Sequence, residues 1–401
     1  MKKNNFDYII IGTGLAGISA IDGIRERDKK GSILLVGKEK HLPYDRPPLS
    51  KALWSGKQTY ESIFLRDTKF YADNKVELTP GKTIVNLNPD EKIIQASSGD
   101  RYHYRKLLLA TGGVPRTLTI PDADLEDICY FRYLDDYITI KNKARQDTTV
   151  TIVGGGFIGS ELAAALAMNK VKVTMIFPES YLIQRIFPEY LGKAIQQYYI
   201  QRGITILSED LPVSFEKKRN KLITRIKNGK EIFSEIIIVG AGIVPSVELA
   251  KMAELKIENG ISVDSYLRTS DPHIYAAGDN AYFPYLALGQ NMRIEHWDNS
   301  LNQGKYAGLN MAGAKKRYDY MPFFYSDLFE FGYEAVGEVN SQLETFADWK
   351  KENDTGVIYY LKNGIIRGVM MCNVWDKVKT ARTLIKSGKK RTLKQLKGLI
   401  A

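Results

Sequence analysis

The sequence GTGLAG occupies residues 12–17, and a second glycine-rich stretch, GGGFIG, occupies residues 154–159. Each follows a short apolar run typical of a β-strand and precedes small residues typical of a helix. In such a strand–turn–helix the first glycine permits a tight turn, the second lets backbone N–H groups approach a pyrophosphate, and the third lets helix and strand pack closely. Each stretch is therefore a candidate dinucleotide site, with a glycine turn that binds no nucleotide as the alternative.

The residues around each turn predict a βαβ unit. For the first we expect a strand at 8–11, a helix at 18–24 and a strand at 33–36. For the second we expect a strand at 151–153 and a helix at 161–167. A following strand, at 171–176, completes that unit. An acid that can accept hydrogen bonds from a ribose diol follows each unit, Glu39 in the first and Glu179, 20 residues beyond Gly159, in the second.

Further along the chain, buried strands are expected at 107–110, followed by a Thr-Gly-Gly turn, and at 236–239, followed by Gly-Ala-Gly. A further strand is expected at 274–279, where it ends in a glycine and an acid. From about Met321 the pattern changes to alternating, aromatic-rich segments, 323–331 and 357–361, which indicate a small α+β domain. The expected fold class is thus α/β, with two dinucleotide-binding domains and a small C-terminal α+β domain.

Composition sets limits on the kind of protein. The 401 residues suffice for two or three domains, and no apolar run approaches the roughly 18 residues that a membrane span needs. The N-terminal residues indicate a first strand and not a signal peptide, so we expect a cytoplasmic protein. Cys129 and Cys372 are the only cysteines and form no CxxC pair, which argues against a disulfide framework and a thiol relay. No metal site is expected.

The formal net charge is +11, and cations gather at the C-terminus. They are Lys377, Lys379, Arg382, Lys386, Lys389, Lys390, Arg391, Lys394 and Lys397, and Asp376 is the only acid from residue 376 onward. The simplest interpretation is a solvated helical face. The alternatives are a docking surface for an acidic electron carrier, for an anionic membrane or for nucleic acid, of which the last is disfavoured because no aromatic residues alternate with the charges.

Seven short motifs in a fixed order make the chain similar to a known family. They are PYDRPPLSK (43–51), ATGG (110–113), GGGFIGSE (154–161), AGD (277–279), EHW (295–297), SD (326–327) and GYEA (332–335). Over almost its whole length the chain resembles the FAD-dependent NAD(P)H oxidoreductases that include rubredoxin and ferredoxin reductases, monodehydroascorbate reductase and apoptosis-inducing factor.

The resemblance implies two Rossmann-like domains of the glutathione-reductase kind. A discontinuous FAD-binding domain would comprise residues 1–115 and 245–318, an NAD(P)H-binding domain residues 116–244, and the C-terminal domain residues 319–401. The cofactors implied are FAD and NADH, with NADPH left open by Arg185 near Glu179.

The same resemblance assigns site residues. Those implied for FAD are Gly12, Gly14, Leu15, Ala16, Gly17, Glu39, Arg46, Lys51, Ile84, Ala110, Thr111, Gly112, Arg132, Asp279, Glu295, His296 and Trp297. Those implied for NAD are Gly154, Gly155, Gly156, Phe157, Ile158, Gly159, Glu179, Arg185, Gly242 and Glu334.

Five residues are implied near the reacting atoms: Lys51, Glu161, Phe157, His296 and Tyr325. Lys51 and Glu161 would form an ion pair beside the flavin ring, and Phe157 would separate flavin from nicotinamide. Tyr325 stands where the family often has Trp, and it offers a smaller aromatic face. For the ion pair, Phe157 and His296 a purely structural role is the alternative.

The expected function is electron transfer from NADH through FAD to a small acidic iron–sulfur protein, rubredoxin or ferredoxin, by a monomer or homodimer. Two alternatives remain. One is a reductase of quinones or small organic acceptors in peripheral contact with a membrane, through Leu393, Leu396 and Leu399. The other is an interaction protein gated by NADH.

Overall fold

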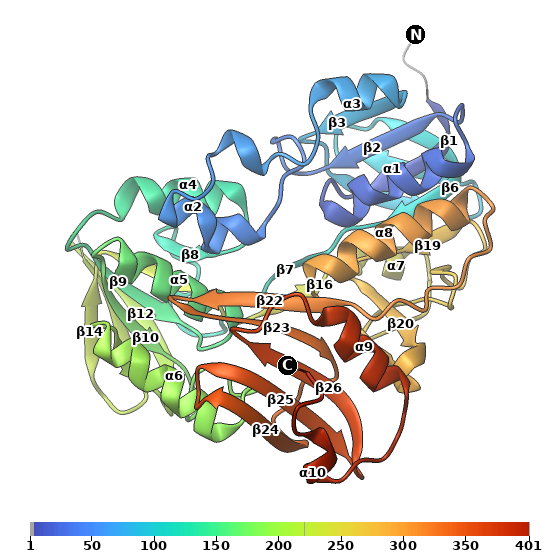
Figure 1. Ribbon diagram of the computed structural model, residues 1–401. Helices are drawn as coiled ribbons and strands as arrows, with labels where there is room; N and C mark the ends of the chain where they lie inside the picture. Colours follow the sequence, from blue (N-terminus) through green and yellow to red (C-terminus); the bar gives the residue numbers. More distant parts are fainter. Residues whose placement is uncertain (1–3, 220, 401) are drawn as a thin grey trace. The chain divides into compact units, whose positions relative to one another are not determined.

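The computed structural model describes residues 4–219 and 221–400, which form two compact units (Figure 1). Unit 1 contains the described residues up to Asp45 together with 60–114 and 245–322, and unit 2 contains 46–59, 115–244 and 323–400. The chain passes between the units along β7 (Gly113–Pro115) and β16 (Ile243–Pro245). Residues 46–59 thus cluster with unit 2, whereas the three-domain division implied by the resemblance stays a prediction.

Unit 1 is built on a seven-stranded sheet in the order β3-β2-β1-β6-β5-β4, with β19 paired to β6. The strands are β1 (Asn5–Ile11), β2 (Ile33–Gly37), β3 (Val76–Pro80), β4 (Ile84–Asn88), β5 (Ile93–Ala96), β6 (Arg101–Leu109) and β19 (Ile274–Ala276). The pairs among β1, β2, β3, β6 and β19 are parallel. The residues of β2 and β19, the last four of β1 and the last three of β6 are buried, which explains why these stretches are continuous apolar runs in the sequence.

Two long helices of unit 1, α1 (Leu15–Arg27) and α8 (Trp297–Met311), pack against each other (Figure 1). Unit 1 also contains the short helices α3 (Thr68–Asp73) and α7 (Glu248–Met252) and two 3₁₀ turns, Glu61–Ile63 and Leu286–Leu288. A small sheet has the order β17-β18-β20-β21. Its strands are β17 (Ile257–Glu258), β18 (Gly260–Ser262), β20 (Ala281–Tyr285) and β21 (Gln290–Met292).

The first sheet of unit 2 is parallel and has the strand order β11-β10-β9-β15-β8. These strands are β8 (Ile128–Tyr130), β9 (Thr149–Val153), β10 (Lys172–Ile176), β11 (Thr205–Leu207) and β15 (Ile236–Val239). An antiparallel sheet of β12 (Pro212–Lys218), β13 (Lys221–Ile226) and β14 (Glu231–Ser234) follows. The helices of this part of unit 2 are α2 (Ala52–Ser55), α4 (Leu134–Lys143), α5 (Phe157–Met168) and α6 (Glu189–Gln201). A 3₁₀ turn at Pro47–Ser50 precedes α2.

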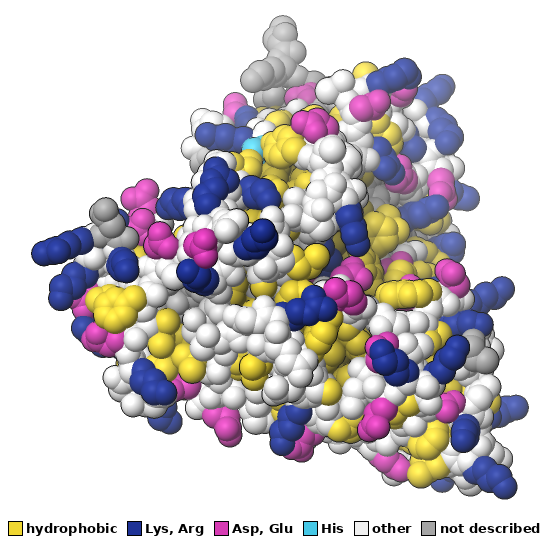
Figure 2. Space-filling model, turned by 60° about the vertical axis from the view of Figure 1, so that its left-hand side comes forward, with side chains coloured by type: hydrophobic (Ala, Val, Ile, Leu, Met, Phe, Trp, Pro, Cys, Tyr) yellow, Lys and Arg dark blue, Asp and Glu magenta, His cyan; other side chains and the backbone are white. Residues whose placement is uncertain are grey.

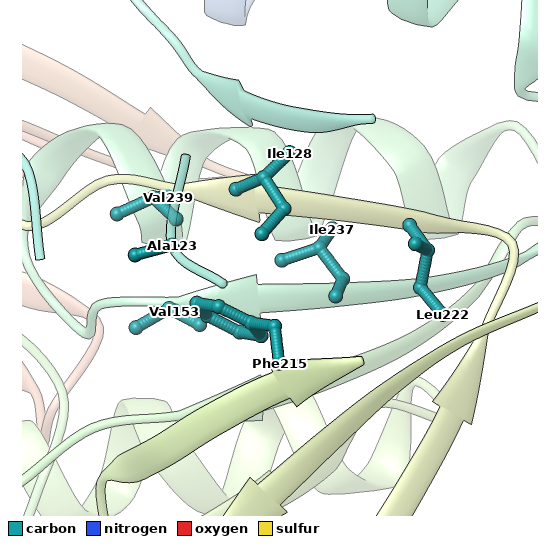
Figure 3. Close-up of a cluster of buried hydrophobic side chains, with 7 residues drawn as sticks. All are labelled: Ala123, Ile128, Val153, Phe215, Leu222, Ile237 and Val239. Atoms are coloured by element: carbon teal, nitrogen blue, oxygen red, sulfur yellow. The ribbon is translucent and has the colours of Figure 1, made fainter. Parts of the chain in front are cut away.

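The parallel sheet and the antiparallel sheet share an apolar core (Figure 3). The cluster consists of Ala123, Ile128, Val153, Phe215, Leu222, Ile237 and Val239. Phe215 is 1% exposed and joins β12 to strands β9 and β15. This core fixes the end of β9 from which the second glycine turn departs.

The last part of unit 2 is a five-stranded antiparallel sheet in the order β22-β23-β26-β25-β24. Its strands are β22 (Phe323–Leu328), β23 (Phe331–Gly337), β24 (Glu344–Lys351), β25 (Thr355–Lys362) and β26 (Ile365–Cys372). Helix α9 (Val378–Lys386) buries Ala381 and Ile385 against β23 and β26, and α10 (Leu393–Leu396) follows. The predicted α/β class with a C-terminal α+β region is confirmed.

Candidate functional site: two glycine cradles and a buried ion pair

The first glycine turn has a geometry that only glycine satisfies. Gly12, directly after β1, has φ +118°, and a Cβ there would lie 2.0 Å from the Ala110 carbonyl oxygen. Gly17 is equally constrained, because its Cβ would lie 2.0 Å from the Gly12 carbonyl oxygen. Gly14 is different: it is the N-cap of α1, no described side chain caps it, and no atom lies within 4 Å of a Cβ placed there. The turn therefore leaves space beside the helix N-terminus, toward which the unpaired N–H groups of α1 point.

The second turn repeats this arrangement in unit 2. Gly154 has φ +125° and a Cβ position 2.5 Å from the Gly240 carbonyl oxygen, while that of Gly159 lies 2.0 Å from the Gly154 carbonyl oxygen. Gly156 is the N-cap of α5, has no side-chain cap among the described residues, and has open space at its Cβ position. Gly155 packs on Phe177, whose ring is 2.6 Å from its Cβ position. The two turns thus match at their first, third and sixth residues.

The two predicted ribose acids follow strands β2 and β10. Glu39 accepts a short hydrogen bond from the Tyr44 hydroxyl, so its carboxylate is already oriented within unit 1. Glu179 is half-buried, and its backbone carbonyl accepts a hydrogen bond from the Glu209 N–H at 3.1 Å. Each acid lies beyond the carboxyl end of the strand that neighbours its glycine turn, which is where a nucleotide ribose lies in such folds.

A polar cluster in unit 1 contains the predicted residue Thr111 and two amides, Asn280 and Gln303, that the sequence did not single out. Asn280 donates to Thr111 Oγ1 at 2.9 Å, and Gln303 accepts from the Gly278 N–H at 2.9 Å. Both amides are fully buried, yet Asn280 Oδ1 and Gln303 Nε2 have no hydrogen-bond partner in the part of the chain that the structure describes. Buried orphan groups of this kind fit a polar ligand.

The three residues 295–297 lie directly before and at the start of α8. Arg293 donates to Glu295 and to the Asp279 carbonyl, and Trp297 donates to Asp45 Oδ1 at 2.6 Å. Burial lowers the pKa of His296 to about 4, against an opposing effect of the Asp279 charge. His296 is therefore neutral at pH 7 and can donate or accept a hydrogen bond without carrying a charge.

The predicted ion pair is present in unit 2. Lys51 Nζ lies 3.0 Å from Glu161 Oε1, and the two side chains are 13% and 6% exposed. The ammonium also lies 3.4 Å from the Tyr325 carbonyl oxygen and 4.5 Å from the centroid of its ring. Lys51, Glu161 and Tyr325, three of the five residues predicted near the reacting atoms, are thus one cluster.

Two serines complete this cluster. Ser326 donates to Glu161 Oε1 and Ser50 donates to Glu161 Oε2, each at 2.6 Å. The sequence motifs contained both serines but gave them no role. Only the fold reveals it, because they lie 111 and 165 residues from Glu161 along the chain.

Phe157 begins α5 and lies four residues before Glu161, on the same helix face. Its ring is 5.8 Å from that of Phe324 in an edge-to-face arrangement. Phe324 in turn lies two residues before Ser326, on the same face of β22. Helix α5 therefore contacts β22 through two pairs of side chains: Phe157 packs on Phe324, and Glu161 accepts a hydrogen bond from Ser326.

The remaining predicted residues lie on several different elements. The Arg46 guanidinium carbon is 5.3 Å from the Tyr133 ring centroid, and the Arg132 N–H donates to Asp136. Ile84 starts β4 and is 8% exposed, while Ile158 on α5 is 39% exposed. Leu15 begins α1, and the exposed Gly242, with φ +91°, accepts a hydrogen bond from the Arg116 N–H.

Two predicted nucleotide contacts lie in the sheet of β22–β26 or beside it. The Arg185 carbonyl accepts a hydrogen bond from the Ser341 N–H at 3.0 Å. Glu334 on β23 is half-buried, its Oε2 has no hydrogen-bond partner among the described residues, and burial beside Asp376 raises its pKa. Glu334 therefore has one carboxyl oxygen without a hydrogen-bond partner in the described part of the chain.

The cysteines have environments that disfavour thiolate chemistry. Burial raises the pKa of Cys129 to about 12 and that of Cys372 still further above its ordinary value. Among residues 4–219 and 221–400, no group of three or more His, Cys, Asp or Glu side chains could hold a metal ion. Over the same residues, no helix is long and apolar enough to cross a membrane.

Comparison with known proteins places this geometry in context. Residues 6–304 match the pyridine nucleotide-disulphide oxidoreductase family, and residues 307–355 match the C-terminal domain of mitochondrion-associated apoptosis-inducing factor. The chain is similar to apoptosis-inducing factor 1 of Dictyostelium discoideum (34% identity; 98% of this chain and 80% of that protein). It is also similar to rubredoxin-NAD(+) reductase of Pseudomonas putida (33%; 80% and 83%). Among solved structures, the covalent putidaredoxin reductase–putidaredoxin complex matches with a TM-score of 0.91 (29%; 98% and 95%).

Proposed function

Because the chain belongs to the pyridine nucleotide-disulphide oxidoreductase family, we propose that it passes electrons from NADH through FAD to a small acidic iron–sulfur carrier of the rubredoxin or ferredoxin kind. The observation that carries this proposal is the pair of matching glycine cradles, each open at the N-cap of its helix. A single cradle would suit a protein that binds one dinucleotide, whereas two suit an enzyme that couples two of them.

The cradle of unit 1 is the proposed FAD site. The N–H groups of α1 and the open space at Gly14 suit the pyrophosphate, Glu39 suits the adenosine ribose, and Asp279 suits the hydroxyl groups of the ribityl chain. The unpartnered Asn280 and Gln303 amide atoms are further donors and acceptors for such a polyhydroxylated ligand. When bound, FAD supplies a group that takes two electrons as hydride and releases them one at a time.

The cradle of unit 2 is the proposed NADH site. The N–H groups of α5 and the open space at Gly156 suit its pyrophosphate. The Glu179 carboxylate would accept hydrogen bonds from the ribose and repel a 2′-phosphate, which favours NADH over NADPH.

The Lys51–Glu161 cluster has the chemistry of a site that stabilises developing negative charge. A buried ammonium that is paired and held can stabilise an anion without reorganising during the reaction. The roles of Phe157, His296 and Tyr325 beside the reacting atoms stay predictions. A thiol relay is not part of the proposal, because burial raises the pKa of both Cys129 and Cys372.

An acidic carrier matches the charge of this chain. Figure 2 shows many lysine and arginine side chains on the visible face, interspersed with fewer acidic ones. On and after α9, Lys379, Lys386, Lys389, Lys390, Lys394 and Lys397 are all exposed. Opposite charges accelerate encounter in a salt-dependent manner.

The test is anaerobic. The purified holoprotein should lose its oxidised-flavin absorbance on addition of NADH, more slowly with NADPH, and regain it when an oxidised iron–sulfur carrier is added. If neither nucleotide bleached the flavin, the proposed function would be refuted. If NADH bleached it but no carrier reoxidised it, the protein would still oxidise NADH, and the proposed iron–sulfur acceptor would be refuted.

A second candidate is an interaction protein whose assembly NADH controls. It is favoured by the similarity to apoptosis-inducing factor 1, which extends over 98% of this chain, and by the C-terminal match at residues 307–355. Sedimentation velocity with and without NADH distinguishes the two candidates: this one requires a change of oligomeric state and slow turnover.

The membrane alternative receives less support from the packing. Of the three leucines that suggested it, Leu396 is 0% exposed and only Leu393, at 49%, is strongly exposed. Sedimentation with anionic vesicles would test the remaining electrostatic contribution.

A further inference from the structure

We infer that Ser50 and Ser326 are positioning residues, which hold the Glu161 carboxylate and, through it, keep the Lys51 ammonium at one place. The inference rests on the proposed function in one respect only: that function explains why the position of the Lys51 ammonium matters. Its geometric basis lies entirely within unit 2.

Three segments meet at the Glu161 carboxylate. Ser50 comes from the 3₁₀ turn before α2, Glu161 from the middle of α5, and Ser326 from β22. Ser326 Oγ and Lys51 Nζ share Oε1, at 2.6 and 3.0 Å, and Ser50 Oγ occupies Oε2 at 2.6 Å. Every carboxylate oxygen therefore has a hydroxyl donor, and one of them has the ammonium as well.

Burial makes these hydroxyls hard to replace. Glu161 is 6% exposed, Ser50 is 2% exposed and Ser326 is 0% exposed. A buried carboxylate that loses a donor is left under-solvated, which costs far more than the same loss at the surface. Removal of either hydroxyl should therefore drive Glu161 to another rotamer or to another donor.

Lys51 depends on Glu161 more than on its other neighbours. The Tyr325 carbonyl oxygen is 3.4 Å away, at the long end of the hydrogen-bond range, and the Tyr325 ring attracts the ammonium without fixing its direction. Glu161 Oε1 is thus nearer to the ammonium than the Tyr325 carbonyl oxygen, and Glu161 is the only charged partner of Lys51 among the described residues. If the Glu161 carboxylate moved, the Lys51 ammonium would therefore lose its present position.

Serine suits this role because its hydroxyl is a neutral donor. A second cation at Oε2 would compete with Lys51 for the carboxylate charge, whereas a hydroxyl orients the carboxylate and leaves the charge to the ammonium. The packing of α5 on β22 adds to the orientation, since the Phe157–Phe324 contact lies one helical turn from the Glu161–Ser326 hydrogen bond.

The experiment measures the chemical reactivity of Lys51 in the purified holoprotein. Limited acetylation with an amine-reactive ester, followed by mass spectrometry of peptides, gives a rate for Lys51 relative to the exposed Lys57. We expect Ser50→Ala and Ser326→Ala each to raise the Lys51 rate by roughly tenfold, the factor expected for one lost hydrogen bond to a charged group. Ser234→Ala is the matched control, because Ser234 is 1% exposed and its hydroxyl has no partner among the described residues.

A double-mutant cycle identifies the pathway. Glu161→Gln should raise the Lys51 rate by itself, and Ser326→Ala added to Glu161→Gln should raise it no further. An unchanged Lys51 rate in both serine variants would overturn the inference, as would an additive effect of Ser326→Ala in the Glu161→Gln background.

A second readout connects the cluster to electron transfer. The midpoint potential of the bound flavin, measured by equilibrium dye titration, should fall in Ser50→Ala and Ser326→Ala and stay at the wild-type value in Ser234→Ala. If NADH does not reduce the flavin of the wild-type protein, the proposed function is wrong. The acetylation rates of Lys51 still test by themselves whether Ser50 and Ser326 position it. An unchanged potential together with raised acetylation would confine the serines to placing Lys51 and would refute a link to the flavin.

Discussion

Gly304 of α8 packs directly on Ala16 of α1: a Cβ at Gly304 would lie 2.1 Å from the Ala16 carbonyl oxygen. One turn further along, Gly308 has the same relationship to Ala20, also at 2.1 Å. Gly23 of α1 repeats it in the opposite direction, with its Cβ position 2.0 Å from the Lys305 carbonyl oxygen. These three contacts let the two helices approach closely, and they set the position of the helix whose N-terminus forms the first cradle.

The helix contact predicts a large effect of a small change. Gly304→Ala should lower the free energy of unfolding by roughly 1–3 kcal/mol or more, because a methyl group cannot fit against a backbone carbonyl and the helices must separate. Urea unfolding measures it. Lys305→Ala, on the same helix, removes an exposed ion pair with Glu26 and should cost no more than about 1 kcal/mol. Equal effects of the two variants would contradict the close packing.

The open N-cap glycines predict that the two cofactors can be lost separately. A Cβ at Gly14 or at Gly156 meets no atom within 4 Å beyond its chain neighbours, so we expect Gly14→Val and Gly156→Val to fold, with each side chain in the space assigned to a pyrophosphate. Gly14→Val should be purified with little FAD, as absorbance at the flavin band would reveal. Gly156→Val should retain FAD and show a KM for NADH raised by at least roughly tenfold. Loss of FAD from Gly156→Val would show that the assignment of the cradles is reversed.

The acid after β10 predicts the choice of nicotinamide nucleotide. Glu179→Gln removes the charge that would repel a 2′-phosphate, so the ratio of kcat/KM for NADPH to that for NADH should rise by roughly tenfold. Flavin reduction by each nucleotide measures it. Glu189→Gln, an exposed acid at the start of α6 that pairs with Lys193, serves as the control and should leave the ratio unchanged. A ratio that stays constant in Glu179→Gln would rule out this residue as the selector.

The lysines on and after α9 predict where a carrier binds. Lys386→Glu combined with Lys389→Glu should lower kcat/KM for an acidic iron–sulfur carrier and flatten its dependence on salt, since attraction is replaced by repulsion. Reduction of a small neutral dye by NADH should stay constant, because it needs no docking surface. The pair Lys29→Glu and Lys30→Glu, exposed in unit 1, makes the same change of charge and should have a smaller effect.

His296 predicts how stability depends on pH. Because burial lowers its pKa to about 4, below the ordinary 6.5, the unfolded chain binds more protons between these values than the folded chain does. The neutral imidazole therefore stabilises the fold fully above about pH 6.5 and progressively less as the pH falls towards 4, by up to about 3 kcal/mol. Urea unfolding of wild type and His296→Gln from pH 7 to pH 4.5 measures it: the difference between them should shrink at acidic pH. A constant difference would mean that His296 titrates normally.

The sequence predicted the regular elements closely. The helix expected at 18–24 is the centre of α1, and the strand expected at 236–239 is β15 without any change of bounds. Both predictions depend on local patterns only. Apolar runs indicate strands and helices, and glycines indicate turns because steric contacts between neighbouring residues exclude other side chains there. The donors to Glu161 could not be predicted, because no spacing rule connects residues that lie more than 100 positions apart.

The sequence by itself determined that there are two cradles, and the reason is stereochemical: a positive φ at Gly12 and Gly154 and a carbonyl in contact with Gly17 and Gly159 admit no other residue. The resemblance to a known family made Lys51 and Glu161 candidates for a pair. Only the tertiary structure showed that Ser50 and Ser326 donate to Glu161, and that Asn280 and Gln303 each have an amide atom without a partner among the described residues. Hydrogen bonds between distant segments depend on how helices and sheets pack, and packing is a property of the whole fold.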